Sequence, residues 1–135
     1  MPDENLWRHI FEGEYKKRKL SGLHHAMFGM SPSGIRIVPL AARKYYKKGF
    51  YQAKIYKVTQ GGGLRPRNGK YSTMFPNAWS QRQVKQTIRK AYLQYLKAGS
   101  NPVSLSKVMG RDYDGISIRF HFDNKKITSV YPEFN

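Results

Sequence analysis

The amino-acid sequence predicts an α+β fold in which one long helix packs against an antiparallel β-sheet. The pattern runs from strands through a single strongly periodic helix to further strands, and a short turn joins the last two strands. A parallel sheet is disfavoured because it needs a helix at nearly every crossover, and only one strong helix is predicted. The length of 135 residues fits a single domain, residues 1–135.

Two strand-forming segments precede the helix. Residues 34–40 read GIRIVPL, a short run rich in β-branched residues, and residues 49–58 place Tyr51, Ala53 and Ile55 at alternate positions. Residues 61–69 follow, with three consecutive glycines. They are predicted to form an irregular, mobile and positively charged loop that can approach a phosphate backbone closely.

The helix is predicted to begin after Ser80, which can cap it, and to end near Gly99. Its apolar positions recur at spacings of three and four: Val84, Ile88, Ala91, Tyr92, Tyr95 and Leu96. The opposite face is basic and is expected to be exposed; it carries Arg82, Lys85, Arg89 and Lys90.

The C-terminal segment predicts a β-hairpin. Apolar residues occupy every second position from Ile116 to Phe122, with polar residues between them. Residues 123–126 read DNKK and are predicted to form the turn, after which residues 127–131 return as the second strand.

Charge indicates the class of partner. Lys and Arg number 25 against 8 Asp and Glu, which makes the net charge +17. The stretch between Glu14 and Asp112 holds 21 of these basic residues and no acidic one. Such a surface favours a polyanion, most commonly nucleic acid, with an anionic membrane surface or an acidic protein as alternatives.

Composition excludes several other classes. The absence of cysteine excludes a disulfide scaffold, a thiolate zinc site and a cysteine nucleophile. No apolar run approaches the roughly 20 residues that span a bilayer, and the N-terminus does not read as a signal peptide. His24 and His25 are adjacent, so they project differently, and no acidic cluster lies near them in the sequence. Neither a metal nor another cofactor is expected.

Acid–base chemistry near neutral pH therefore falls to four histidines, His9, His24, His25 and His121. RNA carries its own nucleophile, the 2′-hydroxyl, so cleavage needs only three groups from the protein. One imidazole takes the 2′-hydroxyl proton, a second protonates the departing 5′-oxygen, and a cation stabilises the charge on phosphorus.

Three separated segments form an ordered set of motifs: residues 9–14 (HIFEGE) with 21–24 (SGLH), residues 70–76 (KYSTMFP) and residues 129–132 (SVYP). Together they resemble the EndoU-type endoribonucleases, including the EndoU domains of bacterial polymorphic toxins. The first is similar to the family's paired-histidine segment, with the same fifteen-residue step between histidines, the second to its catalytic-lysine segment and the third to its C-terminal signature. The order of the motifs agrees from Trp7 to Pro132.

The resemblance implies catalytic roles for His9, His24 and Lys70. By analogy, His24 is the general base and His9 the general acid. The resemblance also implies that Ser129 and Tyr131 bind the nucleobase. Alternation along a strand independently puts residues 129 and 131 on one face, where a hydroxyl can bond a base edge while a phenol ring stacks on it.

Four further residues receive other assignments from the sequence. Ser72 and Thr73 are candidates for phosphate contact near Lys70, with an ordinary strand-edge role equally open. His25 is expected to be only a neighbour of His24, and His121 to be exposed.

Cationic surroundings are expected to lower both catalytic histidine pKa values. A bell-shaped pH–rate profile follows.

The sequence thus predicts a metal-independent endoribonuclease that leaves 2′,3′-cyclic phosphate and 5′-hydroxyl ends. The resemblance implies cleavage at uridine; whether tRNA, ribosomal RNA or RNA in general is cut stays open. It also implies a secreted or delivered toxin fragment that acts in the target-cell cytoplasm as a monomer and has an acidic immunity protein as partner. The alternatives are a non-enzymatic RNA-binding domain and, last, a DNA nuclease, which lacks clustered carboxylates for divalent ions.

Overall fold

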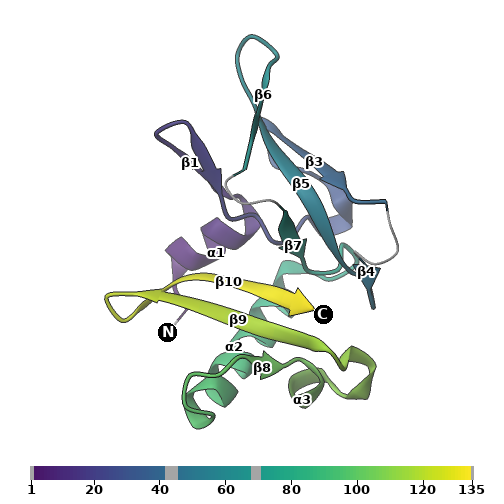
Figure 1. Ribbon diagram of the computed structural model, residues 1–135, viewed down its shortest axis with the longest axis vertical. Helices are drawn as coiled ribbons and strands as arrows, with labels where there is room; N and C mark the ends of the chain where they lie inside the picture. The colour runs from purple at the N-terminus through teal and green to yellow at the C-terminus, as the bar shows by residue number, and fades with distance from the viewer. Residues whose placement is uncertain (1, 42–45, 68–70, 135) are drawn as a thin grey trace.

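A computed structural model describes residues 2–41, 46–67 and 71–134 (Figure 1). The architecture is mixed α+β, as predicted, with antiparallel sheets, one 17-residue helix and two short α-helices. Among the described helices, none combines the length and apolar character needed to cross a membrane.

The first sheet is built around β5 (Phe50–Val58), which pairs with four shorter strands. These are β3 (Ile35–Pro39), β4 (Tyr46–Lys47), β6 (Leu64–Pro66) and β7 (Ser72–Met74). Both predicted strands are confirmed, and Tyr51, Ala53 and Ile55 all point into the core.

The loop prediction for residues 61–69 was wrong in part, and its last two residues, 68 and 69, lie outside the described residues. Leu64 to Pro66 form β6, which pairs with the end of β5 in the register Val58↔Leu64 to Tyr56↔Pro66. Gly62, at φ +83°, allows the tight turn that brings the chain back, and Thr59 and Gly63 close it through backbone hydrogen bonds. The ladder bonds of this return strand override the poor local propensity.

The second sheet contains the predicted hairpin. Strands β9 (Ile116–Asp123) and β10 (Lys126–Phe134) pair, and β8 (Val103–Ser104) joins the edge of β9. The register shifts between Ile127 and Ser129. Because of this bulge, Ile127 and Val130 are both buried, while Ser129 and Tyr131 fall on the polar face of the hairpin.

Helix α2 (Gln81–Lys97) matches the predicted helix. The Ser80 side chain accepts a hydrogen bond from the Gln83 amide, as expected for an N-cap. The residues Val84, Ile88 and Ala91 are buried, but Leu96 is 58% exposed, contrary to the prediction. Tyr95, also a predicted apolar position, does pack: its ring lies against Phe120 and Phe122 of β9.

Helix α1 (Glu4–Phe11) was not predicted. Asp3 caps it by accepting from the Leu6 amide at 3.0 Å, and its inner face buries Leu6, Trp7, Ile10 and Phe11. An eight-residue helix is marginal by itself, so packing against β10 and α2 stabilises it. The remaining elements are the β1 (Glu14–Lys16) and β2 (Lys19–Ser21) hairpin, helix α3 (Ser106–Met109), and the short 3₁₀ turns Met27–Gly29 and Arg111–Tyr113.

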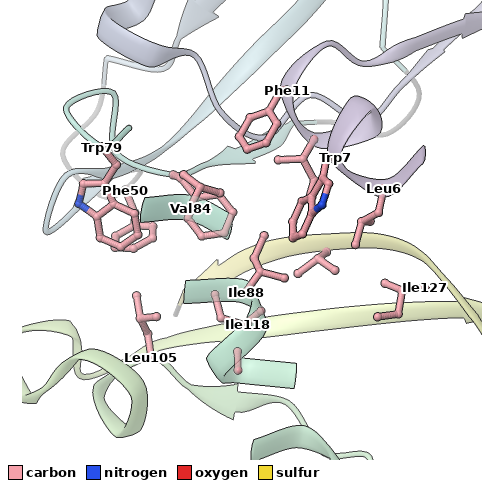
Figure 2. Close-up of a cluster of buried hydrophobic side chains, with 14 of the residues drawn as sticks. Leu6, Trp7, Phe11, Phe50, Trp79, Val84, Ile88, Leu105, Ile118 and Ile127 are labelled. Carbon is pink, nitrogen blue, oxygen red and sulfur yellow. The ribbon is translucent and has the colours of Figure 1, made fainter. Parts of the chain in front are cut away.

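Two hydrophobic clusters form the interior. The larger lies between helices α1 and α2 and the inner face of β9 and β10; Figure 2 shows Trp7, Val84 and Ile88 converging above the strand that carries Ile118. The smaller lies on the first sheet and includes Leu23, Tyr51 and Met74. The segment after β2 therefore runs along the boundary between the two clusters, and it carries His24 and His25.

Candidate active site

The structure brings His9 and His24 together, with ring centroids 6.3 Å apart. His9 lies in the last turn of α1, and the β1–β2 hairpin returns the chain to the end of that helix. The backbone amides of Leu23 and His24 then donate to the His9 and Ile10 carbonyl oxygens at 2.8 and 2.7 Å. The fifteen-residue step is thus the length of one hairpin that folds back onto the helix C-terminus.

Gly22 makes this close approach possible. Its φ is +76°, in the left-handed region that favours glycine. A Cβ atom there would lie 2.4 Å from the His9 carbonyl oxygen and 2.9 Å from two atoms of the His9 ring. Any side chain at this position would push the first histidine away from the second.

His24 is 1% exposed, and its hydrogen bonds define its tautomer. Nδ1 lies 2.8 Å from the Thr73 carbonyl oxygen, which can only accept, so Nδ1 carries the proton and Nε2 carries the lone pair. Nε2 is buried and has no hydrogen-bond partner in the described part of the chain. Burial, and next the positive charge of Arg67, lowers the His24 pKa to about 3. His24 is therefore neutral at pH 7.

His9 has a different environment. Its Nδ1 lies 3.2 Å from Glu14 Oε1, so the carboxylate orients the ring and favours the charged imidazolium. Burial lowers the His9 pKa, whereas the hydrogen bond and charge of Glu14 raise it. The two histidine pKa values are thus lowered as predicted, but burial rather than surrounding positive charge is the main cause. The environments set the two rings apart: one has an acidic partner, and the other has a backbone carbonyl.

Tyr131 joins this pair from the other sheet. Its ring stacks on His24 with centroids 5.3 Å apart and an interplanar angle of 25°. It also stacks on His121 at 5.3 Å and 23°, and its hydroxyl lies 2.8 Å from His121 Nε2. Ser129 shares the polar face of β10 with Tyr131 and pairs with His121 in the strand register. Sequence reasoning placed His121 on an exposed face, correctly, but missed this contact. The contact depends on the register shift, without which Ser129 would pair with Phe120 and Tyr131 with Ile118.

Arg67 is a site residue that sequence reasoning missed. Its Nε donates to the Gly22 carbonyl oxygen at 2.8 Å, which holds the half-buried guanidinium beside the paired-histidine segment. Its charge lowers the pKa of both His9 and His24. Leu20 of β2 and Arg67 form a parallel bridge, so only the meeting of two distant segments places this cation. Glu14 was also missed, although it stands five residues after His9 in the quoted motif.

The two predicted phosphate-contact residues, Ser72 and Thr73, both lie beside His24. Ser72 is buried, and its hydroxyl donates to the Leu23 carbonyl oxygen at 2.6 Å and lies 3.1 Å from His24 Nδ1. Thr73 accepts from His24 through its carbonyl, while its own Oγ1 is buried and unpartnered among the described residues. Lys70 lies outside the described residues.

His25 has a packing role. Its Nε2 donates to the Trp79 carbonyl oxygen at 2.9 Å, and its ring meets Phe11 edge-on at 5.6 Å. In the part of the chain that the structure describes, no group of three or more histidine or acidic side chains could hold a metal ion.

Comparison with known proteins identifies the family. A family model described as bacterial EndoU nuclease matches residues 3–133. A Bacillus cereus protein named "Toxin" is 29% identical over 130 residues, which cover 95% of this chain and 22% of that protein. The chain therefore spans about a fifth of the length of this curated relative. No solved structure matches significantly. Since the family model covers nearly the whole chain, the protein belongs to the bacterial EndoU nuclease family.

Proposed function

We propose that the protein is an endoribonuclease that cleaves RNA by attack of the 2′-hydroxyl, without a metal ion. The observation that carries this proposal is the pair of imidazoles, 6.3 Å apart, whose hydrogen-bond partners differ. Transfer of two protons by two such groups is what cyclic-phosphate formation requires.

His24 is the base in this mechanism. Its neutral Nε2 takes the 2′-hydroxyl proton while O2′ bonds to phosphorus, and the bond from phosphorus to O5′ breaks. Glu14 and the negative charge of the bound phosphate raise the His9 pKa, and the protonated His9 donates its proton to the departing O5′. The different environments of the two rings support this order of roles, which sequence analogy alone proposed.

The buried position of His24 Nε2 adds one requirement. The substrate must displace a neighbour to reach this atom, and the partly exposed Tyr131 ring stacks directly on His24. A shift of this ring upon binding opens the imidazole and presents the phenol face to a base. Tyr131 and Ser129 then seat the base, uridine by analogy with the family, and stacking of this kind contributes about 1–3 kcal/mol per base.

The phosphate is held by positive charge and by hydrogen bonds. Arg67 contributes a guanidinium beside both histidines, and Lys70 contributes an ammonium by analogy with the family. The unpartnered Thr73 Oγ1 is a donor for a phosphate oxygen. The Ser72 hydroxyl, by contrast, already donates to the Leu23 carbonyl oxygen and lies beside His24 Nδ1, the ring nitrogen that does not act as the base.

We further propose that the chain is the nuclease part of a longer toxin, because its relative in Bacillus cereus carries that name and is several times longer. Delivery into a target cell brings the nuclease to its RNA, with tRNA as one candidate. A producer cell then needs an inhibitor, and the charge of +17 favours an acidic immunity protein that covers the proposed active site.

The test incubates the protein with RNA in EDTA and maps the ends of the products. The expected products carry 2′,3′-cyclic phosphate and 5′-hydroxyl ends, and a substrate without the 2′-hydroxyl at the cleavage site is expected to stay intact. His9→Ala and His24→Ala should lose cleavage, whereas Lys97→Gln, an exposed change on α2, should keep it. Intact RNA with a salt-dependent gel shift would instead identify a non-enzymatic RNA-binding protein.

A further inference from the structure

We propose that a cavity lined by His9, and not by His24, binds the nucleotide that follows the scissile phosphate. This inference rests on the proposed ribonuclease function and goes beyond the catalytic pair and the base seat. The cavity has a volume of about 520 Å³, within the range of small-molecule sites. It lies between the start of α1, strand β1 and the first residues of β10.

The lining of the cavity suits a nucleotide. Leu6 and Ile127 contribute apolar surface at its floor, where a base face can lie. Asn5 and Thr128 are both exposed and contribute an amide and a hydroxyl that can bond a base edge or a ribose. An apolar floor with a small number of polar groups is the usual composition of a ligand site.

Charge at the cavity favours an anion. The cations are Arg8, Lys16 and Lys126, and the carboxylates are Asp3 and Glu14. Both carboxylates are already engaged. Asp3 caps α1, and Glu14 bonds His9 through Oε1 and lies 3.5 Å from Lys16 Nζ through Oε2. Two of the cations are paired as well, Arg8 with Glu12 at 3.7 Å and Lys16 with Glu14. A phosphate next to the base therefore meets Lys126, for which the described residues provide no ion pair.

Strand β10 connects this cavity to the base seat. Thr128 lines the cavity, Ser129 is the next residue, and Tyr131 stacks on His24. His9 is the wall that the cavity shares with the catalytic pair.

The direction of the RNA follows from the chemistry. If His9 protonates the departing 5′-oxygen, the nucleoside that bears this oxygen lies on the His9 side. The RNA then runs along β10, with its 5′ nucleoside at Tyr131 and its 3′ neighbour in the cavity.

The experiment compares two substrates with the same 5′ nucleoside. One is a dinucleoside monophosphate, whose leaving group is a nucleoside; the other is a nucleoside 3′-(4-nitrophenyl phosphate), whose leaving group has neither ribose nor base. The variants are Asn5→Ala, Thr128→Val and Lys126→Gln, at exposed positions where the fold tolerates change. Each is expected to lower kcat/KM for the dinucleoside by about 3- to 10-fold, as loss of one hydrogen bond or ionic contact does, and to leave the aryl substrate within about twofold.

The matched control is Lys125→Gln. Lys125 is the neighbour of Lys126 in the hairpin turn, carries the same charge and does not line the cavity. It should leave both substrates unchanged. Equal losses on both substrates, no loss on either, or an equal loss in the control would overturn the subsite. Wild-type protein that cleaves neither substrate nor RNA would overturn the proposed function itself, which separates the two failures.

Discussion

Acid is expected to destabilise this protein through His24 in particular. The imidazole is 1% exposed, and its pKa in the folded protein is about 3, against about 6.5 in the unfolded chain. Between these values the unfolded chain binds a proton that the folded protein does not bind. The stability that His24 contributes is therefore complete above pH 6.5 and is lost as the pH falls toward 3.

The magnitude follows from the shift. Each pH unit within this window changes the free energy of unfolding by about 1.4 kcal/mol. Lowering the pH from 7 to 4 crosses roughly 2.5 units of the window, so His24 alone should cost about 3 kcal/mol. That is a large share of the about 5–15 kcal/mol that stabilises a typical domain.

The assay is urea unfolding at pH 7 and pH 4, followed by the fluorescence of Trp7 and Trp79, both of which are buried. His24→Asn supplies the comparison, because its amide can still donate to the Thr73 carbonyl but does not titrate. The loss of stability between the two pH values should be about 3 kcal/mol smaller in this variant. Lys97→Gln, an exposed change on α2, should lose as much as the wild type.

Acid-sensitive groups distant from His24 contribute equally to the wild type and the variant, so the difference reports on His24 and on its coupling to His9. If His24→Asn and the wild type lose the same stability between pH 7 and pH 4, the buried neutral imidazole is not what the fold depends on.

Three further predictions concern His9 and His24. Gly22→Ala should destabilise the protein by at least about 2 kcal/mol and abolish cleavage, because the new Cβ would lie 2.4 Å from the His9 carbonyl oxygen and φ is positive. The control is Gly61→Ala, where a Cβ would have no neighbour within 4 Å. It should change neither thermal unfolding nor activity. Glu14→Gln removes the charge that raises the His9 pKa, so the alkaline limb of the kcat/KM profile should move to lower pH. An alkaline limb at the same pH as in the wild type would show that another group sets it. Arg67→Gln removes a charge that lowers both histidine pKa values, so the pH–rate profile should shift to higher pH while kcat falls at least tenfold. A fall in kcat with no shift of the profile along the pH axis would contradict the placement of this cation.

Local patterns determined much of the fold. The strand β5, the hairpin β9–β10 and the helix α2 have periodicities and end signals within 10 to 20 residues, so their existence could be predicted from the sequence. The family was also within reach, because its motifs are short, separated and ordered along the chain. The alternation that puts Ser129 and Tyr131 on one face is likewise a property of the strand itself.

Other features needed the whole fold. Helix α1 is too short to be stable alone and forms because Trp7 and Ile10 have a core to enter. The low pKa of His24 depends on burial between β7 and β10, elements far from it in the sequence. Arg67 reaches the site only because β2 and the end of β6 meet.

The sequence by itself thus determined which residue types are present for the chemistry and which elements carry most of them. Tertiary structure alone decided the environment of each imidazole: a carboxylate beside one, a carbonyl and a tyrosine ring beside the other. The physical reason is that protonation depends on desolvation and on charges within a few ångströms, and these are set by contacts between distant segments.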